Sequence, residues 1–230
     1  METHELKVIA RIESDFKTKF GVPRQSGLVP ELTARVVFEP EYRNPDALRG
    51  IEGFDRLWLI WRFSETAREE WRPTVRPPRL GGNARMGVFA TRSPFRPNPL
   101  GLSCVTLARV DWDASDGPAL LVGGADLVDG TPIYDVKPYA PYADAHPDAR
   151  CGFASAPPET VAVDFPPELF ARVDEGRRAA LLGVLAHDPR PRYQDDPTRV
   201  YGMAFGGYEV KFRVAHGVLT VVDVQKSRGR

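Results

Sequence analysis

The chain has 230 residues, of which 42% are hydrophobic and 27% charged, and a chain of this length and composition can bury a sizeable core without a disulfide or metal staple. Its 31 basic residues balance its 31 acidic residues, which argues against a general nucleic-acid-binding protein. Two cysteines are too few for a disulfide scaffold, the N-terminus has no signal-peptide pattern and no stretch approaches the roughly 20 apolar residues of a spanning helix, so we expect a cytoplasmic protein with no membrane contact.

Short strands separated by turns are predicted for the first two thirds of the chain, because 22 prolines and 20 glycines favour turns over long helices. Apolar runs or apolar–polar alternation predict strands at 6–12, 34–38, 57–61, 102–112, 119–122 and 133–136. The run 57–61 is apolar on both faces and is predicted to be central. In the run 102–112, alternation puts five residues on one face: Leu102, Cys104, Thr106, Ala108 and Val110. Together these strands favour a closed or nearly closed barrel.

The last third of the chain has a different pattern. Two Pro-Pro pairs near residues 155–167 bracket either a linker or a last barrel strand. One helix is predicted to begin near Pro167 and to end at Asp188. Three strands follow, at 200–205, 208–214 and 219–224. We therefore expect a mostly β protein with a barrel domain and a small C-terminal α+β domain, with bounds 1–162 and 163–230.

Basic residues are unevenly distributed along the chain. Between Trp71 and Val110 there are seven arginines and no Asp or Glu, whereas acids gather at 111–116. A local basic field on a neutral protein suits one anionic ligand or one region of an RNA. A solvated arginine-rich loop explains the charge alone equally well.

The segment 87–103 combines this charge with stiffness. Three prolines within six residues fix the backbone and lower the entropy lost on ligand binding. Arg92 and Arg96 then project from a preorganised backbone beside the amide of Asn98. Guanidinium groups suit the recognition of carboxylates and phosphates.

Two further segments have unusual compositions. In 123–139, a Gly-Gly pair and three aspartates (Asp126, Asp129 and Asp135) precede Lys137, although a turn aspartate that caps its own backbone explains any single one of them. The segment 186–193 is a rigid basic turn, which a plain helix stop also explains. Conventional sites are missing from the sequence: there is no metal-ligand spacing, no Rossmann turn, no Walker loop and no Gly-x-Ser-x-Gly elbow.

These three segments resemble the TsaA-like family, also called TrmO or YaeB. The strings that carry the resemblance are GGNARMGVFATRSPFRPNPLGLS, DLVDGTPIYDVKPY and DPRPRY, with VPRQSGLV and RGIEGFDRLWLI before them. The resemblance covers nearly the whole chain. It implies a homodimeric β-barrel methyltransferase that uses S-adenosylmethionine, bound near the dimer interface, to methylate N6 of threonylcarbamoyl-adenosine at position 37 of tRNA, beside the anticodon.

The resemblance also implies the cofactor contacts, which fall in an early loop, after the central strand, in the basic motif, in the strand that follows it and in a glycine turn: Ser26, Gly27, Leu28, Glu65, Thr66, Arg92, Leu102, Gly123, Gly124, Ala125 and Asp126. Two places depart from the family pattern. Ser26 stands where a proline is usual, and Ser64-Glu65 replaces a His-Gln-like pair. Backbone groups can still serve as contacts there, in which case the identity of the side chain is unimportant.

The reaction requires a base and an anion-binding group. The acceptor nitrogen bears a proton, so we take Asp135 and Asp188 as candidate bases, with Asp129 behind them and Lys137 as a further catalytic residue. The substrate contacts are predicted at Arg85, Arg96, Asn98 and Arg190, and the threonyl carboxylate is predicted to meet Arg96, Lys137 or Arg190. No metal is expected. The alternatives are a non-catalytic RNA- or nucleotide-binding barrel and a small-molecule methyltransferase or hydrolase.

Overall fold

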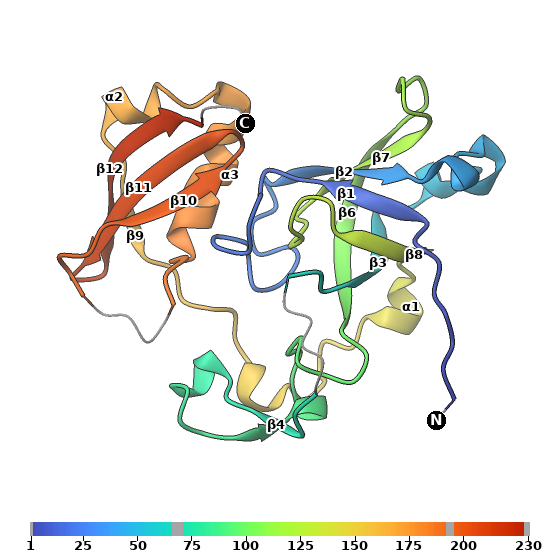
Figure 1. The fold of residues 1–230 in the computed structure, drawn as a ribbon, viewed down its shortest axis with the longest axis horizontal. Helices are drawn as coiled ribbons and strands as arrows, with labels where there is room; N and C mark the ends of the chain where they lie inside the picture. The colour runs from blue at the N-terminus through green and yellow to red at the C-terminus, as the bar shows by residue number, and fades with distance from the viewer. Residues whose placement is uncertain (1, 66–70, 192–195, 228–230) are drawn as a thin grey trace.

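A computed structural model describes residues 2–65, 71–191 and 196–227. Within these residues, six antiparallel strands close into a barrel and a four-stranded sheet forms a second, C-terminal unit beside it (Figure 1). This architecture confirms the predicted mostly β fold. None of the helices in the described ranges is long and apolar enough to cross a membrane.

The barrel has the strand order β1-β2-β7-β6-β3-β8. Its strands are β1 (Ala10–Glu13), β2 (Thr33–Phe38), β3 (Arg56–Arg62), β6 (Leu100–Asp111), β7 (Ala119–Gly123) and β8 (Pro132–Pro138). Each predicted run is a strand, although β1 begins four residues later than the predicted start at Leu6. Alternate apolar side chains such as Ile12, Leu57 and Ile133 are fully buried and fill the interior, so the barrel is a packed core rather than a channel.

The prediction that one face of β6 holds five alternate residues is wrong. Gly101, Ser103 and Val105 point into the barrel, whereas Leu102 is 52% exposed on the outer surface. A bulge between Leu107 and Arg109 then shifts the alternation, so that Val110 is buried. The inward glycine has a steric cause, because a Cβ on Gly101 would lie 2.2 Å from the indole of the buried Trp61.

The variant Gly101→Ala should therefore destabilise the barrel. The added methyl group overpacks the site against Trp61 and should lower the free energy of unfolding by about 1–3 kcal/mol, as measured by urea denaturation. Gly53→Ala is the matched control, since no described atom lies within 4 Å of the Cβ it would add. Equal stability of the two variants would contradict this account of β6.

Short elements lie between the barrel strands and after the last of them. A two-stranded ribbon, β4 (Thr74–Val75) with β5 (Met86–Gly87), lies apart from the barrel (Figure 1). The other short elements are η1 (Pro40–Tyr42), η2 (Pro45–Leu48), η3 (Ile51–Gly53), η4 (Pro78–Leu80), η5 (Val88–Ala90), α1 (Pro141–Asp144) and η6 (Gly152–Ala154).

The C-terminal sheet has the order β10-β11-β12-β9, and its strands are β9 (Ala162–Asp164), β10 (Tyr201–Phe205), β11 (Tyr208–Ala215) and β12 (Val218–Lys226). Residues near 155–167 are therefore neither a plain linker nor a last barrel strand, because β9 pairs in parallel with β12. The single predicted helix is also wrong: the chain forms α2 (Pro167–Phe170) and α3 (Glu175–Ala186). Between them Asp174 is extended, and its N–H donates to the hydroxyl of Tyr208 at 3.1 Å.

Candidate active site

A large open cavity of about 2410 Å³ lies against the barrel. It is lined by parts of the β1–β2 connection, the end of β3, the β4–β5 ribbon, the loop that follows the ribbon, and residues near 151–158. A pocket for one small molecule typically occupies roughly 300–1,000 Å³. This cavity therefore has room for a cofactor and a nucleoside together.

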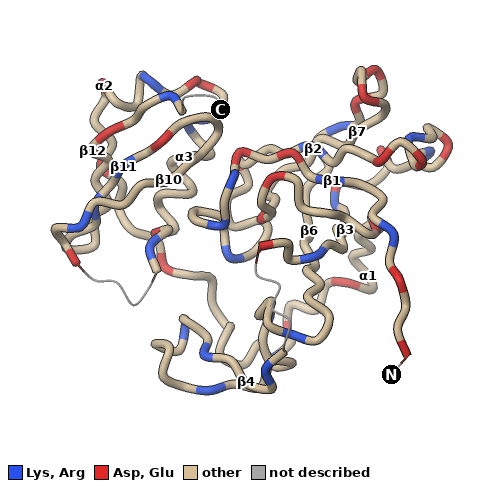
Figure 2. The backbone as a smooth tube through the Cα atoms, viewed as in Figure 1, with Lys and Arg blue, Asp and Glu red and all other residues tan. Residues whose placement is uncertain are grey.

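The cavity wall is strongly basic. Among the described residues that line it are two acids, Glu65 and Asp126, against one lysine and seven arginines: Lys19, Arg24, Arg72, Arg76, Arg79, Arg85, Arg92 and Arg96. Basic residues without acids follow the chain around the β4 ribbon (Figure 2). Such a wall attracts an anion and raises its local concentration.

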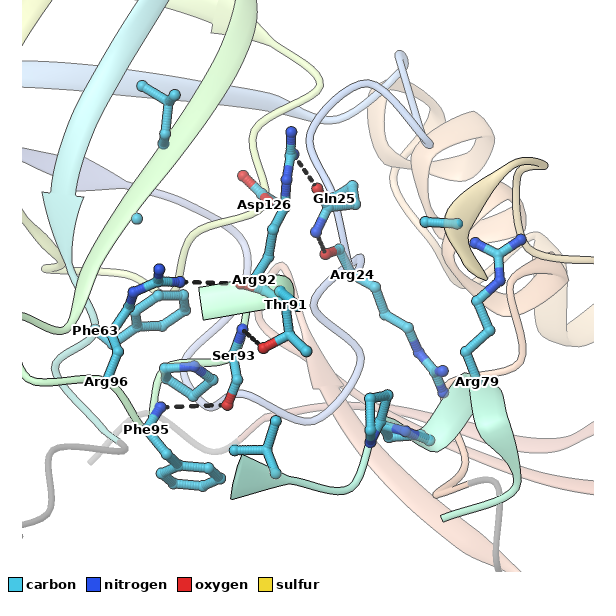
Figure 3. Close-up of a pocket in the computed structure, with 18 of the residues that line it drawn as sticks. Arg24, Gln25, Phe63, Arg79, Thr91, Arg92, Ser93, Phe95, Arg96 and Asp126 are labelled. Atoms are coloured by element: carbon cyan, nitrogen blue, oxygen red, sulfur yellow. Dashed lines mark hydrogen bonds between the residues drawn. The ribbon is translucent and has the colours of Figure 1, made fainter. Parts of the chain in front are cut away.

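The loop between η5 and β6 is held by its own side chains (Figure 3). The hydroxyl of Thr91 accepts from the N–H of Ser93 at 3.3 Å, and the hydroxyl of Ser93 accepts from the N–H of Phe95 at 3.3 Å. The guanidinium of Arg96 donates to the carbonyl of Thr91 at 3.1 Å. These bonds and the prolines of this loop support the predicted preorganised backbone.

Arg92 connects this loop to the early loop between β1 and β2. Its guanidinium donates to the side-chain oxygen of Gln25 and lies beside Asp126 (Figure 3). Gln25 in turn donates to the carbonyl of Arg24 at 2.5 Å. A cation and a carboxylate thus face the cavity side by side.

Asp126 is the half-buried carboxylate of the cavity. Its Oδ1 accepts from the hydroxyl of Ser103 at 2.5 Å, and Ser103, which is fully buried, accepts from the indole N–H of Trp61 at 2.9 Å. Burial raises the pKa of Asp126 to about 6, against the opposing effects of the Ser103 hydrogen bond and the charge of Arg92. The charge of this group therefore changes just below neutral pH.

This raised pKa predicts a pH-dependent cost to folding. Below about pH 4 Asp126 is protonated in both the folded and the unfolded chain. Between about pH 4 and 6 the unfolded chain loses this proton while the folded chain keeps it, and the folded chain loses it as the pH rises through about 6. Stability from the protonated group is therefore lost over this window. A shift of about two pKa units corresponds to roughly 3 kcal/mol, so Asp126→Asn should gain about that much over the wild type between pH 4 and 7.5 in urea denaturation. A difference independent of pH would contradict the burial of this carboxylate.

The early loop and the glycine turn meet through their backbones. The N–H of Gly27 donates to the carbonyl of Gly124 at 2.8 Å, and the hydroxyl of Ser26 accepts from the N–H of Cys104 at 3.1 Å. Gly124 has φ +71°, and a Cβ on it would lie 3.2 Å from the Cα of Gly27. Glycine is needed here both for the backbone angle and for the close approach.

Comparison with known proteins gives the family. A model described as the tRNA-methyltransferase O N-terminal domain matches residues 11–145, and one described as the TrmO C-terminal domain matches residues 158–227. The chain belongs to the TrmO family. An Escherichia coli relative named tRNA (adenine(37)-N6)-methyltransferase is 45% identical over 93% of this chain and 94% of its own length.

A relative and a solved structure from Pseudomonas aeruginosa extend the comparison. One relative, whose name refers to an S-adenosylmethionine-dependent methyltransferase, is 40% identical over 96% of this chain and 98% of its own length. A crystal structure of TrmO from the same species superposes with a TM-score of 0.79 at 33% identity, covering 97% of this chain and 99% of that one. The TrmO fold thus extends over both units of the chain.

Most of the TrmO contacts expected from the sequence gather in one place. Eight of the predicted residues line the cavity: Leu28, Glu65, Arg85, Arg92, Arg96, Asn98, Leu102 and Asp126. Ser26, Gly27, Gly123, Gly124 and Ala125 belong to the joined backbone segments next to it. Glu65 accepts from the N–H of Lys19 at 3.1 Å. Thr66 lies outside the described residues.

The other predicted residues lie away from the cavity as the described residues define it. Asp135 and Lys137 form an ion pair of 2.8 Å on β8, where the bulge opposite Ile60 and Trp61 leaves Asp135 beside Ile60. Asp188 and Arg190 form a bidentate pair of 2.9 and 2.8 Å in the turn after α3. Asp129 binds Lys17 at 2.6 Å. One copy of the chain therefore does not bring these groups to the cavity.

Two aromatic residues were not predicted from the sequence: Phe89, which lines the cavity, and Trp71, which lies outside the lining and stacks on Phe89. Trp71 is 49% exposed and Phe89 is 71% exposed, and their rings stack with centroids 6.2 Å apart. Arg96 lies 5.9 Å from the centre of the Phe89 ring. Aromatic residues within an arginine-rich, acid-free stretch were the available signal, because such interleaving is typical of single-stranded nucleic-acid binding.

Proposed function

We propose that this chain transfers a methyl group from S-adenosylmethionine to N6 of adenosine 37 in tRNA. The observation that carries the proposal is the pair of Arg92 and Asp126, side by side in a basic cavity too large for the cofactor alone. The name of the Escherichia coli relative and the TrmO family models support it. The basic wall and the exposed aromatic pair suit the anticodon loop of an RNA.

The donors present suit the proposed cofactor. S-adenosylmethionine carries a carboxylate, which a guanidinium such as that of Arg92 can bind, and an ammonium group and ribose hydroxyls, which an ionised Asp126 can bind. Bound there, the cofactor supplies a methyl group that is already electrophilic. The chain then has to align the acceptor nitrogen with this methyl group, which the stiff Arg92–Asn98 loop favours.

We assign threonylcarbamoyl-adenosine as the form of adenosine 37 that is methylated, and its product is the N6-methyl derivative. Of the three cations expected to hold the threonyl carboxylate, Arg96 lines the cavity and Lys137 and Arg190 do not, so we assign this role to Arg96, with Arg85 beside the RNA. Unmodified tRNA should then be a much poorer substrate, because these cations lose their partner. Equal methylation of modified and unmodified tRNA in a purified assay would overturn the assignment.

Two of the remaining catalytic candidates, Asp135 and Lys137, fit a site shared between the copies of a homodimer. Asp135, Ile60 and Leu102 form one row across the outer face of β8, β3 and β6, and Leu102 also lines the cavity. This face carries the apolar Ile60 and Leu102 beside the charged Asp135. A second copy packed against it would bring its Asp135 and Lys137 toward the cavity of the first. In that arrangement Asp135 removes the proton from the acceptor nitrogen, whereas Asp188 is held by Arg190 and serves the turn instead.

Mixing two inactive variants tests the shared site. Arg92→Ala and Asp135→Asn, refolded together, should recover about one quarter of the wild-type activity. Half of the dimers are then mixed, and each mixed dimer has one intact site out of two. Light scattering gives the oligomeric state in the same samples. A monomer, or no recovery from mixed dimers, would contradict a site shared between copies.

The exposed aromatic pair is expected to hold a base next to the target adenosine. Phe89→Ala should raise the KM for tRNA about tenfold, because a stacked base contributes about 1–3 kcal/mol, and should leave cofactor affinity unchanged. Trp112→Ala is the control, since Trp112 is also exposed but lies away from the cavity. Equal KM values for the two variants would show that Phe89 does not stack on a base of the tRNA.

Nucleoside mass spectrometry tests the function as a whole. Wild-type protein with S-adenosylmethionine should add one methyl group to threonylcarbamoyl-adenosine in tRNA, and calorimetry should detect cofactor binding. A non-catalytic RNA-binding barrel would bind tRNA with neither result. We further propose that the protein acts in the cytoplasm. We also propose the domain bounds 1–162 and 163–230, which place the boundary at the start of β9, a strand of the second sheet.

A further inference from the structure

The connection between β1 and β2, residues 14–32, is long and has no helix or strand of its own. Six of its residues line the cavity: Lys19, Val22, Pro23, Arg24, Gln25 and Leu28. A loop of this length keeps one conformation in a compact protein when its side chains are packed against a scaffold. The contacts that hold this loop in place therefore determine the shape of this side of the cavity.

The side chains of this connection are buried in the core of the C-terminal unit. Phe16, Val29 and Leu32 are at most 2% exposed and belong to the same apolar cluster as α3 and β10–β12. The ring of Phe16 meets Phe205 edge-on with centroids 5.5 Å apart. The connection therefore completes the C-terminal core, although in sequence it belongs to the barrel.

Polar contacts fix the same interface. Asp15 accepts from the guanidinium of Arg177 in α3 at 3.2 Å, and its carbonyl accepts from the N–H of Gly206 at 2.9 Å. In Figure 1 the connection lies between the barrel and the C-terminal unit, on the side of α3. Two parts of the C-terminal unit, α3 and the turn between β10 and β11, thus bind the same residue of the connection, Asp15.

The contacts nearest the cavity come from the end of α3. The Nε2 of His187, the residue that follows α3, lies 3.0 Å from the carbonyl oxygen of Leu28, which requires the proton on Nε2. A Cβ on Gly183 would lie 2.6 Å from the Val29 side chain, so the helix packs directly on this residue of the loop. The turn that carries His187 is held by Asp188, with φ +47°, and its ion pair to Arg190.

We propose that the C-terminal unit positions the cofactor loop of this enzyme, with His187 as the positioning residue that holds the carbonyl of Leu28. The inference rests on the proposed function, because the loop matters only if Ser26–Leu28 and Arg92 bind the cofactor. It gives the His-Asp-Pro-Arg turn a role that is neither a plain helix stop nor a contact with RNA. The C-terminal unit then acts on cofactor affinity and not on tRNA affinity.

The test compares His187→Ala with His187→Gln, whose side-chain amide can still donate to Leu28. His187→Ala should raise the Kd for S-adenosylhomocysteine and the KM for S-adenosylmethionine about tenfold, because one partly buried hydrogen bond is lost. Its kcat at saturating cofactor and its Kd for tRNA should stay within about twofold, and His187→Gln should recover most of the affinity. Arg213→Ala, an exposed change on β11, is the control and should alter neither ligand.

Hydrogen exchange separates this inference from the proposed function. Backbone amides of residues 24–28 should exchange faster in His187→Ala than in the wild type, whether or not a cofactor binds. If this holds but the wild type binds no S-adenosylmethionine, the proposed function fails and the positioning role stands. Unchanged exchange and cofactor affinity would overturn the inference, as would a loss of tRNA affinity alone. If His187→Ala does not fold, Gly183→Ala, which pushes on Val29, replaces it with the same expected results.

Discussion

Replacing Arg92 by alanine should lower kcat/KM for S-adenosylmethionine about 100-fold. Hydrogen bonds to charged groups contribute about 1.5–3 kcal/mol, and this guanidinium is the one that lies beside Asp126 and binds Gln25 of the early loop. Its loss removes the proposed partner of the cofactor carboxylate. It also removes a positive charge that lowers the pKa of Asp126, so less of that carboxylate is ionised at neutral pH.

The measurement is a steady-state assay on modified tRNA with cofactor titrated at fixed pH. Arg109→Ala is the matched control, because Arg109 is an exposed arginine of the same acid-free stretch that lies outside the cavity lining. Arg92→Lys should recover only part of the activity, since a lysine cannot reproduce the forked geometry of a guanidinium. Arg92→Ala activity within threefold of the wild type would exclude Arg92 from the cofactor site.

The barrel was predictable because its strands obey local rules. Each apolar run found by alternation is a strand of the barrel, since half-buried strands need a repeat of two. The face of β6 was not predictable in the same way. Leu102 and Ser103 are both compatible with either side of a strand, and the size of Trp61, which needs a glycine opposite it, decides the register. That contact joins residues 40 positions apart.

The helix boundary failed for a related reason. Apolar residues continue at helical spacing through 167–186, but Asp174 is extended because the Tyr208 hydroxyl and the C-terminal core hold it there. Tertiary contacts therefore override local helix propensity at this point. Likewise, nothing in the sequence pattern of residues 14–32 indicates that Phe16 and Val29 belong to the C-terminal core.

The candidate site shows the same division between local and long-range information. The segment that contains Asp126, Asp129 and Asp135 was found from its glycines and acids, but the three carboxylates are equivalent on local grounds. The fold separates them: Asp126 accepts a hydrogen bond from Ser103 of the neighbouring strand β6, Asp129 binds Lys17, and the β8 bulge places Asp135 on the outer face. Which aspartate faces the cavity is thus a property of the barrel closure.

Asp126→Asn tests whether Asp126 is the aspartate that faces the cofactor, and it should have a large effect on cofactor affinity. The variant keeps the size of the side chain and can still bind Ser103, but it loses the negative charge that faces the cofactor. At pH 7.5 its Kd for S-adenosylmethionine should be about 50-fold higher than that of the wild type, within the range for a hydrogen bond to a charged group. Calorimetry measures both proteins under the same conditions.

The pH dependence of binding identifies the charge as the cause. Asp126 is protonated as the pH falls through about 6, so wild-type affinity should decrease about fourfold between pH 7.5 and 5.5. In Asp126→Asn the Kd should be the same at both pH values, because the group that titrates is gone. A wild type without this dependence, or a variant that retains it, would mean that another group controls the cofactor site. Asp135→Asn should instead keep both the affinity and its pH dependence while losing turnover, because Asp135 of one copy is assigned to the substrate proton and not to the cofactor.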